Sequence, residues 1–327
     1  MMNYEEFKQS LLERLEENKP DNVLMFKTFS RPRTNEDNTE ILTLMYRDFS
    51  NLAPIFYLKD MYAALEQGMY EIEEYVADII DYVKRQQYED RNFDIDDICI
   101  EKADECLKLR LYNREWNQNI ERSCAHINIV DLIAVPVWET HVKGESGTIV
   151  VDKGLQRDIL KMTDDELLGA ATRNTLNEKF VLKTMDTMLR ESMSEEDQGF
   201  LDELVPNDVM YVLTNEDVCL GSTAIFSKNV LKMAQEKLGE NYFVLPSSIH
   251  ETILVRESKV DSPEALKEVV ESVNVTVSQK ELLSENVYRF NGRHLQVCNT
   301  MQDWKMQIER EQAQLWQGRN MERRVGL

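Results

Sequence analysis

Residues 242–255 read YFVLPSSIHETILV, two apolar runs that Pro246 separates. Aromatic and β-branched residues at this density are typical of buried strands. Because proline cannot donate to a strand ladder and restricts the residue before it, the strand must break at Pro246. We therefore predict one strand over residues 242–245, a second over residues 249–255, and a structural corner between them.

The corner carries four candidate functional residues, Ser247, Ser248, His250 and Glu251. The serine hydroxyls can satisfy the loosened backbone. On a strand Glu251 faces apolar neighbours, where its pKa rises or a cation pairs with it. We expect Glu251 to hold a neighbouring element, so that Glu251→Gln lowers stability by about 1–3 kcal/mol. A catalytic role for His250 and Glu251 is the alternative.

Sequence motifs for metals, cofactors and phosphate are missing. His250-Glu251 begins the zincin pattern, but Leu254 stands where the second histidine would be needed. The five cysteines are odd in number and show no CxxC spacing. The glycine-containing stretch 144–154 lacks both the Walker lysine pattern and a dinucleotide fingerprint. We expect no metal and no cofactor.

The remaining elements indicate an α+β fold of mixed, mostly antiparallel sheets covered by amphipathic helices. Asn3 and Glu6 form a capping box for a first helix, and residues 23–29 and 41–46 suit a hairpin. A stripe over residues 72–83 predicts a helix on a sheet, and residues 222–226 a short strand. Strands and helices interleave without a regular βαβ repeat.

Three regions are expected along the chain. They are an N-terminal α/β lobe (residues 1–92), a main α+β lobe packed against it (93–298) and a C-terminal helical extension (299–327). The first two form one continuous unit. An acidic stretch between Asp90 and Asp97 ends the first lobe.

Asp131 interrupts the apolar run 127–137, which is typical of a central strand buried on both faces. A buried carboxylate needs a partner, so we expect Asp131 to be hydrogen-bonded. The structural role is favoured over a catalytic one.

Asn113 and Asn117 are candidate binding residues, four apart on a predicted polar helix over residues 113–122. Asparagine has poor helix propensity, so both side chains should point inward to polar partners. His126 is a further candidate, because Cys124 lies two residues before it as an isolated nucleophile.

Composition limits the function. The chain has 327 residues and a net charge of −22, which repels phosphate backbones and anionic lipid surfaces. Direct binding to nucleic acid or membranes is therefore not expected. No signal-peptide pattern and no apolar run of membrane-spanning length are present, so we expect a cytoplasmic protein with reduced cysteines.

Five strings together resemble one bacterial family, the domain of unknown function 5688. They are LRLYNREWNQNIERSCAHINIVDLIAVPV (109–137), MTDDELLGAATRNT (162–175), MYVLTN (210–215) followed by Gly221, LPSSIHE (245–251) and ELLSENVYRF (281–290). The resemblance covers nearly the whole chain from about residue 3 to 290. It implies a source among Gram-positive gut anaerobes and a gene near mobile elements. It implies no activity, cofactor or catalytic residue.

Two departures from the family pattern stand out. Family members tend to have proline where this chain has Ala125, before His126, and most end soon after Phe290. The tail is therefore extra. Its residues Trp304, Ile308 and Leu315 fall near heptad-like spacing, so the tail either docks on the chain's own body or recruits a protein partner.

The sequence favours a cytoplasmic acidic binding protein, an accessory factor of a mobile element. One alternative is a hydrolase or transferase with His250 and Glu251 in a cleft, which should gather Asp131, Asn113 and Asn117 around the same pocket. A binding protein should show them dispersed and satisfied. A second alternative is a DNA-mimic inhibitor, which needs aligned carboxylates on an elongated face.

Overall fold

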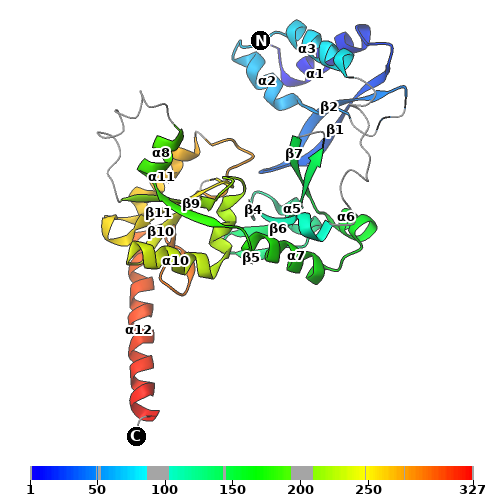
Figure 1. The fold of residues 1–327 in the computed structure, drawn as a ribbon. Coiled ribbons are helices and arrows are strands. Elements are labelled where there is room, and N and C mark those ends of the chain that lie inside the picture. Colours follow the sequence, from blue (N-terminus) through cyan, green and yellow to red (C-terminus); the bar gives the residue numbers. More distant parts are fainter. Residues whose placement is uncertain are drawn as a thin grey trace. The chain divides into compact units, whose positions relative to one another are not determined.

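The computed structural model describes residues 2–48, 50, 53–86, 103–142, 145–192, 209–246, 248–275 and 277–325. The chain divides into two compact units (Figure 1). Unit 1 comprises Met1–Ala103 and Thr140–Gly147, and unit 2 comprises Asp104–Glu139 and Thr148–Leu327. The boundary expected between residues 92 and 93 lies outside the described residues. The predicted α+β class is confirmed, since every strand pair with a described register is antiparallel.

Unit 1 places helices against a sheet of strand order β1-β2-β3. The predicted capping box of Asn3 and Glu6 starts its first helix. The predicted hairpin forms, with longer strands than expected, because Asn35 takes a left-handed φ of 62° that permits a tight turn. The elements are α1 (Tyr4–Glu17), β1 (Val23–Arg33), β2 (Glu36–Tyr46), β3 (Phe56–Tyr57), α2 (Leu58–Glu66) and α3 (Ile72–Arg85).

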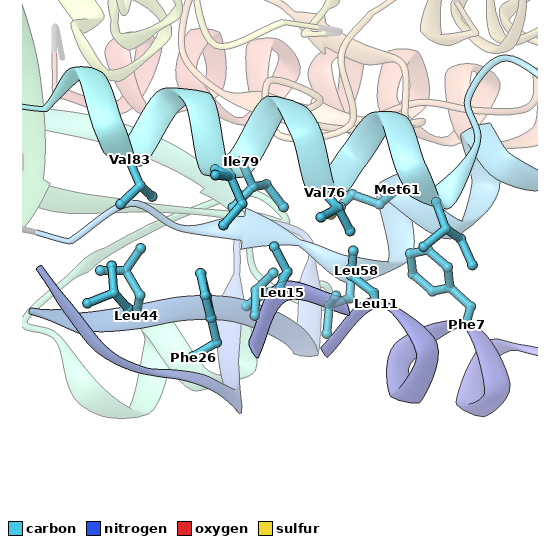
Figure 2. Packing of buried hydrophobic residues seen from close by; sticks show 14 of the residues in the cluster. Phe7, Leu11, Leu15, Phe26, Leu44, Leu58, Met61, Val76, Ile79 and Val83 are labelled. Carbon is cyan, nitrogen blue, oxygen red and sulfur yellow. The ribbon is translucent and has the colours of Figure 1, made fainter. Parts of the chain in front are cut away.

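One apolar core holds unit 1 together (Figure 2). The inward residues of the hairpin pack against the apolar stripes of α1 and α3. The stripe of α3 is the one that the helical spacing predicts. Each fully buried side chain of this kind contributes about 1.5–3 kcal/mol before the entropy of ordering is subtracted. The labelled core residues are Phe7, Leu11, Leu15, Phe26, Leu44, Leu58, Met61, Val76, Ile79 and Val83.

Unit 2 contains a six-stranded sheet of order β13-β12-β10-β11-β9-β8 and a sheet of order β4-β6-β5. Strand β7 pairs with β6, and the parts of these two strands within Thr140–Gly147 belong to unit 1. In chain order the elements are α4 (Ala103–Cys106), β4 (Leu107–Asn113), α5 (Gln118–Ser123), β5 (Ile127–Ile129), β6 (Leu132–Val142), β7 (Glu145–Val150), α6 (Lys153–Leu155), η3 (Gln156–Leu160), α7 (Asp164–Leu176), β8 (Phe180–Thr184), α8 (Met185–Ser192), β9 (Met210–Asn215), η5 (Gly221–Phe226), α10 (Lys228–Leu238), β10 (Tyr242–Leu245), β11 (Thr252–Arg256), η6 (Glu257–Lys259), α11 (Pro263–Asn274), β12 (Tyr288–Phe290), β13 (Leu295–Val297) and α12 (Met301–Val325).

Helices cover both faces of the six-stranded sheet. On one face the Tyr242 hydroxyl donates to the Leu231 carbonyl of α10 at 2.8 Å. On the other face Phe243, the next residue of the strand, packs with Leu266 of α11 and Trp304 of α12. Adjacent residues of a strand point to opposite faces, so α10 lies opposite α11 and α12.

Two predicted strands differ in the structure. The break at Pro246 is confirmed, but β11 begins at Thr252 instead of residue 249. The segment Gly221–Phe226 is a 3₁₀ helix and not a strand. The left-handed φ of 56° at Leu220 turns the chain before this segment and directs it back toward residues 248–252.

Candidate functional site

Residues 280–287, here called the strap, join the two sheets of unit 2. Toward the six-stranded sheet, the Ile249 amide donates to the Glu281 carbonyl at 2.9 Å, and Ser248 pairs with Leu282 in an isolated bridge. Toward the other sheet, the Asn113 side chain donates to the Leu283 carbonyl at 2.9 Å. The strap therefore brings the corner at residues 245–251 and the end of β4 to the same part of the molecule.

Asp131 bonds to the strap and to the strand that follows it. One carboxylate oxygen accepts from Ser284 Oγ at 2.9 Å and from Asn286 Nδ2 at 2.7 Å, and the other accepts from the Tyr288 hydroxyl. Burial and the nearby carboxylate raise the pKa of Tyr288 well above its usual value, so the phenol stays a donor. Both oxygens of Asp131 are therefore occupied by the fold.

The predicted hydrogen bonding of Asp131 is confirmed, but its place in a central strand is wrong. Residues 127–137 form two antiparallel strands, and Asp131 lies half-buried in the turn between them. Val130 in the same turn has a left-handed φ of 54°, which is costly for a β-branched residue. Each arm of this hairpin is apolar, which makes the sequence resemble one long buried strand.

Asn113 and Asn117 are both buried and paired, as predicted. They do not share a helix, however, because Asn113 ends β4 and α5 begins only at Gln118. The Asn113 side-chain oxygen accepts from the amides of residues 115 and 116, at 3.0 and 3.1 Å. This local turn competes with helix formation, which explains the error. Asn117 Nδ2 donates to the Asn113 carbonyl at 2.8 Å.

His250 is anchored through its backbone and its ring. Its carbonyl accepts from Thr214 Oγ1 at 2.8 Å and its amide donates to Ser248 Oγ at 3.0 Å. Ring atom Nδ1 accepts from the Leu220 amide at 3.4 Å. Ser248 thus supports the corner through its hydroxyl, as expected. Ser247 lies outside the described residues.

Ser222 is a key residue of the corner that the sequence reasoning missed. Its buried hydroxyl donates to the Ser248 carbonyl and, at 2.9 Å, to the Glu251 carbonyl. Thr252 Oγ1 donates back to Ser222 Oγ at 3.3 Å. Gly221, directly before the predicted strand 222–226, was the available signal, because a glycine beside a strand can mark a close approach of backbones.

Glu251 contributes its backbone carbonyl to the corner. The pKa of its side-chain carboxyl is raised, mainly because the group is buried and also because Glu281 is near. His250 and a hydrogen bond with Ser248 partly offset this rise in pKa. No ion pair of Glu251 occurs among the described residues. Since the folded state disfavours the charged carboxylate, the expected loss of stability in Glu251→Gln no longer follows.

We predict that Glu251→Gln is as stable as the original chain or more stable at neutral pH. A raised folded-state pKa adds stability at pH values below the ordinary pKa of 4.5, and this stability is lost as pH rises through the folded pKa. Melting temperatures of both proteins between pH 4.5 and neutral pH measure the effect. Glu285→Gln, at an exposed strap position, is the control. A less stable Glu251→Gln at neutral pH contradicts the prediction.

The Cys124 thiol and the His126 ring make separate contacts. His126 Nδ1 lies 3.2 Å from the Cys124 carbonyl, and the thiol lies 3.6 Å from Ser123 Oγ. Burial raises the pKa of Cys124, which is the reverse of what a nucleophilic thiolate needs. These contacts and the raised pKa give no support to a nucleophile and base at these positions, which stay a prediction.

Two cavities are lined by residues other than the candidate functional residues. A groove of about 750 Å³ lies between α1 and α3, and a second of about 430 Å³ lies along α7. None of the candidate residues lines either of them. Within the described ranges, no group of histidine, cysteine and acidic side chains could hold a metal ion. No helix in the described part of the chain is long and apolar enough to cross a bilayer.

The C-terminal helix α12 begins on the body of unit 2. Arg289, only 2% exposed, bonds both Glu257 at 3.0 Å and Glu311 of α12 at 2.5 Å. Trp304 Nε1 donates to Glu257 at 2.8 Å, and its ring meets Phe243 edge-on with centroids 5.1 Å apart. Trp304 therefore serves internal docking.

The two other predicted partner-binding residues of the tail are Ile308 and Leu315. Ile308 is half-buried, and the side chain of Leu315 lies outside the described residues. Further along α12, Trp316 is exposed.

Comparison with known proteins gives one match. Residues 4–292 match the model of a family of unknown function, DUF5688. No curated protein and no solved structure matches the chain. The matched range contains the corner, Asp131 and the strap, and it ends before α12. Because it covers most of the sequence, this chain belongs to the family of unknown function DUF5688.

Proposed function

We propose that this protein is a non-catalytic binding protein of the cytoplasm. Cys124, Cys219 and Cys298 are free thiols, and Cys219 is exposed. Free exposed thiols suit a reducing compartment. The cytoplasmic assignment is part of the proposal.

The observation that carries this proposal is that the fold uses both oxygens of Asp131. A general base needs a free oxygen within hydrogen-bond reach of the substrate proton. Three side-chain donors bond to the two oxygens of Asp131. The side chains of Asn113 and Asn117 donate to backbone carbonyls. His250 Nδ1 likewise accepts from a backbone amide. The hydrogen bonds of these polar residues therefore support a structural role over a catalytic one.

One observation favours a second candidate, a hydrolase or transferase. Glu251 is half-buried, its pKa is raised by burial, and His250 is the adjacent residue. A carboxyl that holds its proton longer than usual can act as a general acid. In this alternative Glu251 is the acid, and His250 Nε2 faces the substrate.

Turnover assays distinguish the two candidates. We expect no hydrolysis of generic ester, phosphate, peptide and glycoside substrates above the buffer rate. We also expect no difference between the original chain, His250→Gln and Glu251→Gln. Glu281→Gln is the matched control, since it removes a carboxylate beside the same corner. Turnover that disappears in Glu251→Gln but survives in Glu281→Gln, at unchanged melting temperature, establishes the enzyme instead.

A further inference from the structure

The hairpin of unit 1 has apolar residues on both faces. On its inner face Phe26 pairs with Leu44, and both lie in the core of Figure 2. On its outer face Met25 pairs with Met45, and Phe29 pairs with Ile41. An antiparallel sheet with one solvated face normally alternates apolar and polar residues. Here the outward positions break that rule.

Three of these outward side chains are exposed. Met25 is 39% exposed, Met45 is 41% exposed and Phe29 is 48% exposed. Ile41 on the same face is fully buried, so part of the face is already covered and part is open. We call Met25, Phe29 and Met45, with Lys27 and Arg31, the outer patch. Large apolar side chains that gather on one face, unlike singly scattered ones, mark an interaction surface.

The charge of the outer patch is opposite to that of the protein. Lys27 and Arg31 alternate with Met25 and Phe29 on the outward side of β1, and both are exposed. Neither cation takes part in an ion pair among the described residues. The whole chain has a net charge of −22. A patch that is apolar and cationic fits a partner surface that is apolar and acidic.

Three positions along the edge of β1 that faces away from β2 are blocked against strand addition. The Phe26 amide, which points away from β2, donates to the Glu16 carboxylate of α1 at 2.8 Å. Lys19 Nζ donates to the Leu24 carbonyl at 3.0 Å. Pro32 removes another donor. These blocked positions disfavour strand addition along β1, whereas a helix packs well on the face of a sheet.

Other occupants fit less well. A second copy that docks face to face through the same patch places Lys27 and Arg31 against the same cations. Nucleic acid is repelled by the net charge of −22. Methionine side chains adapt to varied apolar surfaces and are common where helices are bound.

We propose that the outer patch docks an acidic amphipathic helix of a partner protein. The apolar stripe of that helix packs on Met25, Phe29 and Met45, and its flanking carboxylates pair with Lys27 and Arg31. This proposal rests on the proposed binding function and names the surface and the chemistry of the partner.

Methyl NMR of methionine-labelled protein tests it. The probe is a synthetic helical peptide with leucine on one face and glutamate beside it, and the control peptide has lysine in place of glutamate. We expect the acidic peptide to shift the methyl signals of Met25 and Met45. Met233 and Met306, which are 38% and 39% exposed and lie in unit 2, are internal controls that should not shift.

Variants make the test specific. We expect two variants, Phe29→Ser and the double variant Lys27→Glu, Arg31→Glu, to lower the affinity for the acidic peptide by at least about tenfold. All three positions are exposed, so the variants should keep the melting temperature of the original chain. Lys84→Glu, an exposed charge reversal on α3, should leave the affinity unchanged.

Four results overturn the proposal. They are absent shifts at Met25 and Met45, equal shifts at Met233, tighter binding of an oligothymidine probe that depends on Lys27, and self-association that disappears in Phe29→Ser. The first two leave no specific site for the helix, and the last two assign the patch to nucleic acid or to a second copy. None of them produces turnover, so failure of the patch is distinct from failure of the proposed function.

Discussion

Replacing Gly221 by alanine is expected to destabilise unit 2 by about 3 kcal/mol, at the upper end of the cost of overpacking. A Cβ at this position meets the Thr214 hydroxyl and lies 2.6 Å from both the Asn215 amide and the His250 carbonyl. Two of these three obstacles are backbone atoms, which cannot rotate away as a side chain can. Chemical denaturation monitored by circular dichroism measures the loss.

Gly169→Ala is the matched control for Gly221→Ala. Gly169 lies within α7, and nothing approaches the position of its added Cβ within 4 Å. Alanine in a helix interior is favoured over glycine by about 0.5–1 kcal/mol, so this variant should be slightly more stable. Equal effects of the two substitutions would show that the corner can relax around Gly221.

Arg289→Met is expected to destabilise the protein by about 3 kcal/mol and to release the start of α12. Arg289 is buried between Glu257 and Glu311, and both carboxylates are mostly shielded from water. Without the guanidinium two partly buried negative charges face each other and lose their cation. Hydrogen exchange of the α12 amides, together with denaturation, measures both effects.

Lys179→Met is the control for Arg289→Met. It breaks the ion pair with Glu216, in which both side chains are exposed, so the loss should stay below about 1 kcal/mol. Adding Glu257→Gln and Glu311→Gln to Arg289→Met should recover part of the lost stability. A loss as small as that of Lys179→Met, without release of α12, means that Arg289 is not the anchor.

Local signals made much of the fold predictable. The capping box at Asn3 starts a helix where the sequence motif places it. Pro246 ends a strand because its nitrogen cannot donate to the strand ladder. The stripe of α3 is buried because a helix on a sheet needs one apolar face. In each case the cause lies within a few residues of its effect.

The candidate site was less predictable, because its contacts join distant residues. The hairpin turn at Asp131 depends on donors from Ser284, Asn286 and Tyr288. The 3₁₀ helix after Gly221 depends on close approach to the backbone of the corner. Neither cause is visible in local propensity or periodicity. The sequence alone therefore could not predict that Asp131 and the corner lie in the same part of the molecule.

The strap delays the folding of unit 2 during synthesis, because it joins residues that lie far apart in the sequence. Its bonds to Asn113 and Asp131 span 153 to 170 residues of sequence. At a synthesis rate of about 5–20 residues per second, Asp131 leaves the ribosome roughly 8–30 s before its partners do. Until then the carboxylate must remain hydrated, so the β5–β6 turn cannot bury it. Unit 1 contains α1, α3 and its sheet within the first part of the chain and can form its core earlier, while unit 2 must wait for residues 280–288.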